Sequence, residues 1–596
     1  MDGTGGQSAQ WRTLRELGII AAKNRNGSPL HTFEAQELME HYSAVTCRHP
    51  PCTDEELAAV IETPTLHDAQ PFTFRHVDGV EVLATMHACL SKSKGQSCDS
   101  ISMRYLKDSL HIIMPFFTRI CNTIKDTCHY PSVYLRSLII PLSKKSNPEN
   151  PSDTRPVANL CHLAKVLDTL LTRQMMNYLE SNELLSPLQS GFRARHSTQT
   201  ALLNLLEDVR FAVEKKKVTV LILFDFSKAF DSLSHKILLA RLRAMNFSGD
   251  SLRLIHSYLT GRSQAVLYLD GTTTEFMPNT SGIPQGSSPG PVLYENSVVQ
   301  ALNFTSSTCA LFADDLQCYR SNRRGRLADV IEALNRDAAS ILDWAAASGL
   351  TVNAAKTKAI LLGSIQQLMR IDKTSLPPLR VGDAVIPLSS SVNDLGVTLS
   401  ENLTWNEHIS RPCSSVHRVL YKLKYSGYFL SGTLKRRLVF SLVMPIFDYA
   451  CLTFYDLSDY LNTKLQRLFH VLVRFIFGLR RDTTLRPYLE ELHCLSMADR
   501  RKYFLAMLTW RVLQTGLPGY LDQRLRRLDA TIRRSARLAG DQPGVFDIRR
   551  CRTNAYAGSF SRSAMTLWES LPGSVGRHRR EGGFKAALLA YLAEDR

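Results

Sequence analysis

The chain of 596 residues is too long for one hydrophobic core, so we expect several domains, and its 44% hydrophobic content is that of a folded protein. No apolar run reaches the length of a membrane span, and residues 1–8 lack the apolar core of a signal peptide, which argues against a membrane-spanning or secreted protein. The net charge of +17 favours a polyanionic partner, although such an excess can also serve solubility alone.

The positive charge is concentrated toward the C-terminus. Residues 501–596 include 18 basic and 8 acidic side chains, so about the last sixth of the chain carries much of the excess. We expect this segment to attract a polyanion more strongly than the rest of the chain.

The thirteen cysteines follow no metal-binding pattern. The closest pairs are Cys47 with Cys52 and Cys121 with Cys128, and neither has the spacing of a zinc ligand pair. We expect reduced, mostly buried thiols in an intracellular protein without structural zinc.

The first elements of the chain predict helices and carry no readable functional signal. Amphipathic patterns predict helices within residues 11–20 and 33–42. Apolar residues at helical spacing predict two more, at 82–90 and at 100–123, and we expect Pro115 to interrupt the second.

Basic residues at the ends of two neighbouring segments then lie close together in sequence. The β-prone run 135–142 ends at Lys144 and Lys145, and two Asn-Pro turns later comes Arg155. A hairpin carrying a lysine and then an arginine can clamp a triphosphate, because Lys acts as a point charge and Arg as a bidentate fork. Ordinary exposed cations explain the same pattern.

Helical stripes at 163–178 and 202–213 fit core helices and lead to a strand at 218–224. The continuous apolar run of this strand indicates cover on both faces, and it ends at the carboxylate of Asp225. Phe230 follows five residues later, either as a ring under the sugar of a nucleotide or as a core aromatic.

The next stretch combines a helix, a hairpin and a glycine loop. Ser234 is the expected N-cap of a helix at 235–245, and the Asp270-Gly271 turn predicts a hairpin with strands at 265–269 and 272–276. The loop at 281–287 contains Gln285-Gly286. Its exposed amides could approach a base pair or a phosphate closely, but a tight turn before a helix would look similar.

Two adjacent carboxylates, Asp314 and Asp315, join short β-prone runs at 308–311 and 316–319. The pattern predicts a tight hairpin with both acids at its tip, and taken alone it fits a solvated loop. If the hairpin neighbours the strand that ends at Asp225, three carboxylates converge on one sheet edge and repel one another unless cations lie between them. A pair of Mg²⁺ ions would suit that edge and would support phosphoryl transfer during nucleotide polymerisation.

The remainder of the chain is mainly helical. Apolar residues mark a long helix from Leu327 that ends at Gly349. Lys356, before a strand at 359–362, is either a proton donor to departing pyrophosphate or an exposed loop cation. Residues 394–399 predict a short strand and turn, and the segments expected to be helical are 405–510 and 584–592.

Taken together, these stretches resemble the reverse transcriptases of non-LTR retrotransposons of the jockey and chicken-repeat kind, from about Ser91 to the C-terminus. The motifs that carry the resemblance occur in the family's order. They are Leu184-Leu185-Ser186-Pro187, Gly191-Phe192-Arg193, His196-Ser197-Thr198, Phe224-Asp225-Phe226-Ser227-Lys228-Ala229-Phe230-Asp231, Gly282-Ile283-Pro284-Gln285-Gly286-Ser287, Phe312-Ala313-Asp314-Asp315, Gly349-Leu350, Lys356-Thr357, Leu395-Gly396 and Arg474-Phe475-Ile476-Phe477-Gly478-Leu479.

The resemblance implies an α+β right-hand polymerase fold with fingers, palm and helical thumb. By this likeness the chain divides into an N-terminal extension (1–85), fingers (86–217), palm (218–400), thumb (401–515) and a basic C-terminal region (516–596).

The resemblance also implies roles for individual residues. Asp225 and Asp314 would bind the metal ions, with Asp315 in a less direct catalytic role beside them. Lys144, or its neighbour Lys145, would contact the triphosphate. The other implied roles are triphosphate contact for Arg155, exclusion of the ribose 2′-hydroxyl for Phe230, the template–nucleotide pocket for Gln285 and Gly286, and support of the primer end for Asp394, Leu395, Gly396 and Val397.

The implied activity is RNA-directed DNA polymerisation. The implied partners are an RNA template, a DNA primer or target and dNTPs, and no membrane is implied. The implied cofactors are two Mg²⁺ ions, which Mn²⁺ could replace. The implied location is the cytoplasm and nucleus. Template and primer would bind in the palm groove and on the basic thumb, mainly through phosphate contacts.

The chain also departs from the family pattern. There is no room for the family's endonuclease before Ser91, so we expect a separate protein to supply nicking. The apolar stretch after Ser287 is about three residues shorter than the pattern of the family that the chain resembles. The segment 92–99 keeps only Asp99 of the family's Pro-Asp-Gly motif. The shortened segment keeps open the alternative of an inactive nucleic-acid-binding retroelement remnant. A polymerase that copies DNA templates alone is a further alternative, because it would share the metal site.

Overall fold

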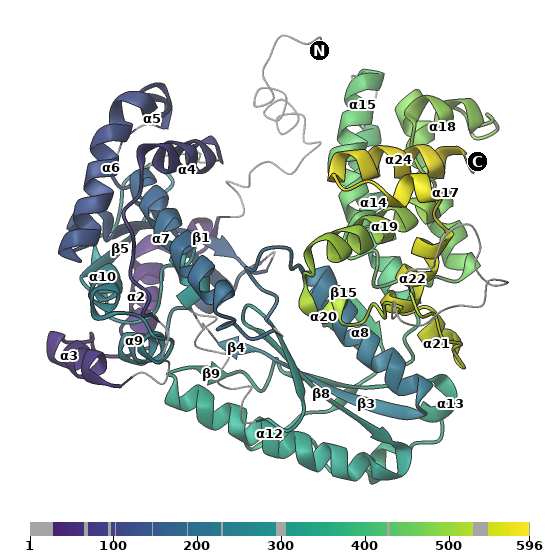
Figure 1. Cartoon of the computed structure of the whole chain (residues 1–596), viewed down its shortest axis with the longest axis horizontal. Coiled ribbons are helices and arrows are strands. Elements are labelled where there is room, and N and C mark those ends of the chain that lie inside the picture. Colours follow the sequence, from purple (N-terminus) through teal and green to yellow (C-terminus); the bar gives the residue numbers. More distant parts are fainter. Residues whose placement is uncertain are drawn as a thin grey trace.

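A β-sheet joins an N-terminal lobe to a largely helical C-terminal lobe (Figure 1). The computed structural model describes residues 28–64, 70–92, 97–99, 101, 103–145, 147–187, 189–227, 230–293, 305–425, 430–528 and 546–594. The helix predicted at 11–20 lies outside this part of the chain. Among the described residues, no helix combines the length and apolarity that crossing a membrane requires.

The central sheet has five strands in the order β13-β10-β3-β8-β7. Its middle strand, β3 (Lys217–Phe224), pairs antiparallel with β8 on one side and with β10 on the other. The remaining strands extend the sheet on either side. Their bounds are Thr308–Phe312 for β7, Asp315–Arg323 for β8, Lys358–Leu362 for β10 and Leu388–Ser389 for β13.

Helices cover both faces of β3, as its apolar run predicts. Leu221 belongs to a core with α8 (Thr198–Glu214), while Val220 and Ile222 face the opposite core with α12 (Leu327–Ala347). Because alternate residues of a strand point to opposite faces, an almost continuously apolar sequence is needed to bury both. The long helix α12 crosses the lower side of the sheet in Figure 1.

The N-terminal lobe is built on a second sheet, ordered β2-β1-β5-β6. Its strands are Arg136–Ser143 (β1), Thr154–Leu160 (β2), Arg262–Val266 (β5) and Met277–Asn279 (β6). Helix α2 contacts β5 and β6. The helices of this lobe are α2 (Ala35–Thr46), α3 (Asp54–Glu62), α4 (Gly79–Lys92), α5 (Met103–Asp108), α6 (Leu110–Thr127), α7 (His162–Ser181), α9 (His235–Ala244) and α10 (Gly249–Leu259).

Two expectations for this lobe were wrong in detail. The helix break falls at Ser109, whose carbonyl oxygen accepts hydrogen bonds from the amides of Ile112 and Ile113, and Pro115 lies inside α6. As the sixth residue of α6, Pro115 lacks the amide hydrogen that would bond to the carbonyl oxygen four residues earlier, and α6 continues through it at the loss of that hydrogen bond.

The predicted hairpin turn at Gly271 is present with a φ of +94°, but the strands around it are much shorter than expected. A single bridge joins Leu267 to Thr273 beyond the end of β5. The Val266 amide donates a 3.0 Å hydrogen bond to the Thr274 hydroxyl and not to a backbone carbonyl. The regular β-ladder ends there.

The C-terminal lobe is helical, which confirms the prediction for residues 405–510. Figure 1 shows its helices stacked above the sheet. They are α14 (Asn406–Tyr425), α15 (Gly432–Leu438), α16 (Met444–Asp448), α17 (Asp459–Phe477), α18 (Arg486–Leu492), α19 (Met497–Thr515), α20 (Gly519–Asp522), α22 (Phe560–Ser570) and α24 (Glu581–Glu594).

One hydrophobic core spans the sheet and this lobe. It contains Leu221 and Ile360 of the sheet, Leu205 of α8, and residues such as Leu420 of α14 and Leu472 of α17. The face of the sheet that carries Leu221 is therefore closed by the C-terminal helices together with α8.

A β-hairpin connects the two regions. Strands β14 (Ser391–Asp394) and β15 (Val397–Ser400) meet at Leu395 and Gly396, which have φ values of +44° and +81°. Positive φ at both turn residues matches the twist of a two-residue hairpin, and Gly allows it without strain. Tyr449, after α16, donates a 2.7 Å hydrogen bond from its hydroxyl to the Leu395 carbonyl oxygen.

Candidate active site

The carboxylate of Asp225 stands immediately after the central strand β3. The Asp225 carbonyl oxygen accepts a 2.7 Å hydrogen bond from the amide of Asn353, which anchors the loop after β9 (Thr351–Val352) beside it. The loop that carries Asn353 and Lys356 therefore forms one wall next to Asp225.

Asp314 lies in the two-residue turn between β7 and β8. Its neighbour Ala313 has a φ of +59°, and Phe312 pairs with Asp315 across the turn. Because Phe224 pairs with Leu316 on the neighbouring strand, the ends of β3 and β8 are level and their acids lie at the same edge of the sheet. The predicted meeting of the hairpin with the strand that ends at Asp225 is present.

Asp225 and Asp314 line one cavity of about 820 Å³. Its walls also include the β1–β2 turn, the glycine loop, one face of α2, the segment after β3, the loop after β9, and Phe192. The lining residues are His41, Tyr42, Val45, Lys144, Lys145, Ser152, Asp153, Thr154, Arg155, Pro156, Phe192, Asp225, Phe226, Ser227, Phe230, Asp231, Pro284, Gln285, Gly286, Ser287, Pro291, Asp314, Asn353 and Lys356.

The cations predicted at the β1–β2 turn reach this cavity. Lys144 donates to the Ser152 carbonyl oxygen at 2.9 Å, and burial together with nearby Lys356 and Arg155 lowers the pKa of Lys144. Lys145 instead forms an ion pair of 2.8 Å with Asp153. Of the two lysines, Lys144 is therefore the one whose charge is directed toward the other groups of the cavity.

The electrostatics of the acids reflect their proximity. Burial raises the pKa of Asp225, Asp314 raises it further, and Lys356, Lys144 and Arg155 act against the increase. Burial, and then the charges of Asp314 and Asp225, raise the pKa of Asp315 to about 6. Like charges this close favour protonation unless cations neutralise them.

Asp315 is set apart from the other two acids. As the first residue of β8 it keeps an exposed surface but is not among the described residues that line the cavity. The charge of Asp315 contributes to the raised pKa of the buried Asp394 on the β14–β15 hairpin.

The glycine loop is fixed against two other elements. The Gln285 side-chain amide donates a 2.7 Å hydrogen bond to the Asp231 carboxylate, and the Gln285 carbonyl oxygen accepts one of 2.8 Å from the Ala158 amide of β2. Gly286 has a φ of +107°, and a Cβ there would lie 3.1 Å from the Ala158 carbonyl oxygen. Gly286 thus permits the loop to lie close to β2 at the cavity wall.

Phe230 lines the cavity and also packs partly against the core around α12. The packing supports the interpretation of Phe230 as a core aromatic, while its position in the cavity lining leaves the role beside a nucleotide sugar as a prediction. The Phe230 carbonyl oxygen accepts a 2.7 Å hydrogen bond from the Ile283 amide, which joins Phe230 to the glycine loop.

The residues assigned to the primer end lie outside the cavity on the β14–β15 hairpin. Asp394 is 3% exposed and accepts a 2.8 Å hydrogen bond from the side-chain amide of Gln317 on β8. Burial raises its pKa to about 7, and the charge of Asp315 adds to the increase. The hairpin is thus tied to the strand that begins at Asp315.

Sequence reasoning missed two residues of the cavity. Asp231 appeared within a quoted motif without a role, and it fixes Gln285. Tyr42 of α2 shares a buried 2.6 Å hydrogen bond with Thr154, and burial raises its pKa to about 12. Nothing in the local pattern of α2 indicates this contact, because its partner is far away along the chain.

The donor chemistry of the cavity fits divalent metal ions. Mg²⁺ in nucleotide sites takes one or two protein carboxylates, with waters and phosphate oxygens as the other ligands. Asp225 and Asp314 provide two such carboxylates. Among the described residues, no group of three or more His, Cys, Asp or Glu side chains is placed to hold a metal ion by itself, so phosphate oxygens would have to complete the coordination.

Comparison with known families decides the class of the domain that contains this cavity. Residues 142–399 match the family described as reverse transcriptase (RNA-dependent DNA polymerase). The chain contains a reverse transcriptase domain. The match covers every acid of the site and, with the observed mixture of helices and sheets, confirms the predicted α+β right-hand polymerase fold.

The curated relatives of this reverse transcriptase domain come from mobile elements. A probable RNA-directed DNA polymerase from transposon X-element of Drosophila melanogaster is 25% identical over 66% of this chain and 44% of that protein. The RNA-directed DNA polymerase from mobile element jockey of the same species is 24% identical over 54% of this chain and 35% of the relative. The predicted resemblance to non-LTR retrotransposon reverse transcriptases is confirmed.

The chain spans less than half the length of these relatives. Among solved structures, apo telomerase from Candida tropicalis, truncated from its C-terminal domain, is 15% identical. The similarity covers 45% of this chain and 54% of that one, with a TM-score of 0.31. Members of the reverse transcriptase family generally depend on divalent metal ions, in keeping with the carboxylate pair.

Proposed function

We propose that the protein is an RNA-directed DNA polymerase that extends a primer 3′-hydroxyl with dNTPs on an RNA template. The observation that carries the proposal is the shared cavity of Asp225 and Asp314, which also receives Lys144 and Arg155. Paired acids facing paired cations suit a metal-bound triphosphate, because the acids bind the metal and the cations bind phosphate oxygens.

Each group of the cavity has a role in this reaction. Asp225 and Asp314 would hold the metal ions, two Mg²⁺ or alternatively Mn²⁺, which would supply activation of the attacking oxygen and charge stabilisation of the leaving one. Lys144 and Arg155 orient the triphosphate, and Asp315 supports the ion-binding edge from β8. Lys356 lies where it can return a proton to the pyrophosphate that leaves.

Substrate selection belongs to the opposite wall. Gln285 and Gly286 line the place of the templating base pair, and Asp231 is a positioning residue because it fixes Gln285. Phe230 occupies the sugar position and disfavours a ribose 2′-hydroxyl. Asp394, Leu395, Gly396 and Val397 form the hairpin on which the primer end rests.

We assign the subdomains along the same lines: fingers at 86–217, palm at 218–400, thumb at 401–515, and flanking segments at 1–85 and 516–596. The partners proposed are the RNA template, a DNA primer or target and dNTPs. Such an enzyme meets RNA in the cytoplasm and its DNA target in the nucleus, and we propose both compartments.

Primer extension tests the proposal. The protein is incubated with Mg²⁺, dNTPs and a DNA primer annealed to an RNA template or, separately, to a DNA template. We expect extension on RNA, its loss in Asp225→Asn, and its retention in Asp329→Asn, a matched change at an exposed acid of α12. Extension on DNA alone would contradict the assignment to RNA templates.

An inactive wild-type protein that still binds RNA would support the second candidate, a nucleic-acid-binding remnant of a retroelement. What favours this candidate is the shortened segment after Ser287 in the sequence. Circular dichroism of the wild type and of Asp225→Asn verifies that any loss of extension occurs in folded protein.

A further inference from the structure

Two cysteines lie opposite each other on the strands that carry the turn of Asp314. Cys309 of β7 pairs with Cys318 of β8, and the turn joins these same two strands. Both are free thiols, and they are 2% and 0% exposed. The pair is therefore a buried group of potential nucleophiles to which the proposed polymerisation gives no role.

The register of β7 and β8 gives this pair the backbone geometry that a disulfide needs. A two-residue turn is closed by a hydrogen-bonded pair, here Phe312 and Asp315, and hydrogen-bonded and non-hydrogen-bonded pairs alternate along an antiparallel ladder. Counted from the turn, Cys309 and Cys318 form a non-hydrogen-bonded pair, in which opposite Cα atoms lie about 4.5 Å apart. Disulfides span Cα separations of roughly 4.4–6.8 Å, so the backbone already meets this requirement.

The two thiols are also in contact. The Cys318 thiol donates a hydrogen bond to the Cys309 sulfur, which lowers the pKa of Cys309 and raises the pKa of Cys318. The hydroxyl of Thr305 lies 3.4 Å from the Cys309 sulfur. Because the thiolate is the nucleophilic form, Cys309 is the sulfur that reacts first.

Cys309 is also the easier of the two thiols to reach. It belongs to β7, at the edge of the described central sheet, whereas Cys318 belongs to β8, between β3 and β7. The neighbouring side chains of Ser306 and Thr308 are exposed. Since only 2% of Cys309 is exposed, an oxidant that approaches from this edge has to be as small as hydrogen peroxide.

We propose that Cys309 and Cys318 form a site of reversible oxidation, at which a small hydroperoxide joins the two thiols in a cross-strand disulfide and thereby slows nucleotide addition. The effect on nucleotide addition rests on the proposed polymerase function. Formation of the disulfide does not, because it depends only on the two thiols and the oxidant.

The oxidation takes two steps. The Cys309 sulfur attacks one oxygen of hydrogen peroxide, so an S–O bond forms, the O–O bond breaks, and the other oxygen leaves as water with the thiol proton. The Cys318 sulfur then attacks the Cys309 sulfur, so the S–S bond forms, the S–O bond breaks, and hydroxide leaves as water with the Cys318 proton. The two sulfurs are oxidised and the peroxide is reduced, and a dithiol reverses the reaction by exchange.

Closure of the disulfide would displace the turn of Asp314. Opposite Cβ atoms in an antiparallel pair are about 4.5–5.5 Å apart, and a disulfide brings them to roughly 3.8 Å, so the strands must approach by about 1 Å. On this face of the sheet, one pair, Leu311 with Leu316, lies between the cysteines and the turn. Leu316 also pairs with Phe224, the residue before Asp225, so the movement changes the spacing of the two acids.

Disulfide mapping tests for the bond without any need for activity. The folded protein is treated with hydrogen peroxide, unfolded in an alkylating reagent, and cut with Asp-N protease, which cleaves before Asp314 and Asp315, between the two cysteines. We expect mass spectrometry to find the peptides of Cys309 and Cys318 joined, and separate after treatment with dithiothreitol. Alkylation of both thiols, or a bond from either one to a different cysteine, would overturn the proposal.

Primer extension measures the consequence of the bond. A displacement of about 1 Å in an active site can slow a reaction by the order of 10²-fold, so we expect peroxide to lower the wild-type extension rate by that factor and dithiothreitol to restore it. Cys309→Ala and Cys318→Ala each leave one thiol of the pair, and either variant should keep its extension rate under peroxide. Inactivation of both variants to the wild-type extent would show that the loss does not pass through this disulfide.

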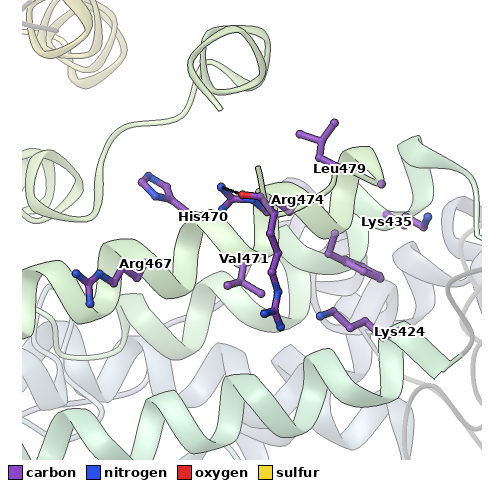
Figure 2. A pocket seen from close by; sticks show the side chains of 10 residues that line it. Lys424, Lys435, Arg467, His470, Val471, Arg474 and Leu479 are labelled. Carbon is purple, nitrogen blue, oxygen red and sulfur yellow. Dashed lines mark hydrogen bonds between the residues drawn. The ribbon is translucent and has the colours of Figure 1, made fainter. Parts of the chain in front are cut away.

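Cys413→Ala is the matched control. Cys413 is another buried thiol, and it lines a cavity of about 440 Å³ in the C-terminal lobe. This cavity shares Arg467 and Val471 with the larger cavity shown in Figure 2, and the described lining of the two cavities includes no residue of β7 or β8. We expect Cys413→Ala to be inactivated by peroxide as the wild type is, and protection by this change would contradict the assignment to the hairpin.

The outcomes separate this proposal from the polymerase proposal. A wild-type protein that forms the disulfide but extends no primer would refute the polymerase function and leave the oxidation site in place. Extension by a protein that forms no disulfide would refute the oxidation site alone. A disulfide that forms without changing the extension rate would overturn the proposed effect on nucleotide addition.

Discussion

The ammonium group of Lys356 lies 3.9 Å from the carboxylate of Asp225. The two residues come from different loops, one after β3 and one after β9, and hydrogen bonding between Asn353 and the Asp225 backbone holds these loops together. Lys356 therefore provides a counter-charge for Asp225 when no other cation is bound.

The position of Lys356 leads to a prediction for catalysis. Lys356→Gln should slow single-turnover extension by about 10²- to 10⁴-fold, the usual contribution of a general acid, and should remove the dependence of the rate on a basic group. The pH–rate profile of nucleotide addition measures both. Lys358→Gln, at the exposed start of β10, is the control, and equal effects of the two changes would refute the role of Lys356.

Phe230 should control the choice of sugar. Phe230→Ala removes the ring from the cavity wall, so we expect incorporation of ribonucleotides to rise relative to deoxyribonucleotides by at least about tenfold, or 1.4 kcal/mol. Competitive extension with dNTP and NTP mixtures measures the ratio. Phe192→Ala, an exposed aromatic at the same cavity, should leave the ratio unchanged if the effect is specific.

The glycine loop should be sensitive to one added methyl group. At Gly282 a Cβ would lie 2.4 Å from the Asp231 carbonyl oxygen, and φ is +76°. Gly282→Ala should therefore cost more than the 1–3 kcal/mol of a left-handed non-glycine residue and should displace Asp231 from Gln285.

Gly271→Ala isolates the backbone effect, because its φ is also positive and its Cβ would meet nothing within 4 Å. Chemical denaturation gives both free energies of unfolding. Similar losses for the two variants would show that the loop tolerates the contact with Asp231.

Asp394 should make stability depend on pH. Its pKa is raised by burial to about 7, so between about pH 4 and pH 7 the folded state keeps a proton that the unfolded state releases. The free energy of unfolding should therefore fall as the pH rises through this window, by up to about 4 kcal/mol at 1.36 kcal/mol per unit.

Asp394→Asn should abolish this contribution. An asparagine keeps the hydrogen bond from Gln317 and remains neutral, so the variant should melt at a higher temperature than wild type at pH 8 and at a similar temperature at pH 4. Asp383→Asn, at an exposed turn, controls for the charge change. A variant less stable than wild type at pH 8 would show that the carboxylate is stabilised there.

Much of the fold follows from local sequence patterns. The apolar run of β3 and the turn at Asp314 are each specified within a few residues, so their positions could be predicted. The pairing of Phe224 with Leu316 could only be hypothesised, because periodicity indicates strands but not their neighbours.

The missed residues depend on contacts between distant segments. Tyr42 meets Thr154, and Asp231 meets Gln285, across more than fifty residues in each case. Neither contact leaves a local signature, since a tyrosine or an aspartate looks the same in sequence whatever its partner. The position of the helix break at Ser109 was missed because proline is the stronger helix-breaking signal in sequence, although α6 continues through Pro115.

The sheet face that carries Leu221 and Ile360 shares its interior with Leu420 and Leu472 of the C-terminal helices. A shorter protein cut to the matched segment 142–399 would leave this interior open to water, at a cost of roughly 25 cal/mol for each Å² of apolar surface uncovered. We expect such a fragment to aggregate on expression, and the intact chain to melt in a single transition that includes both regions.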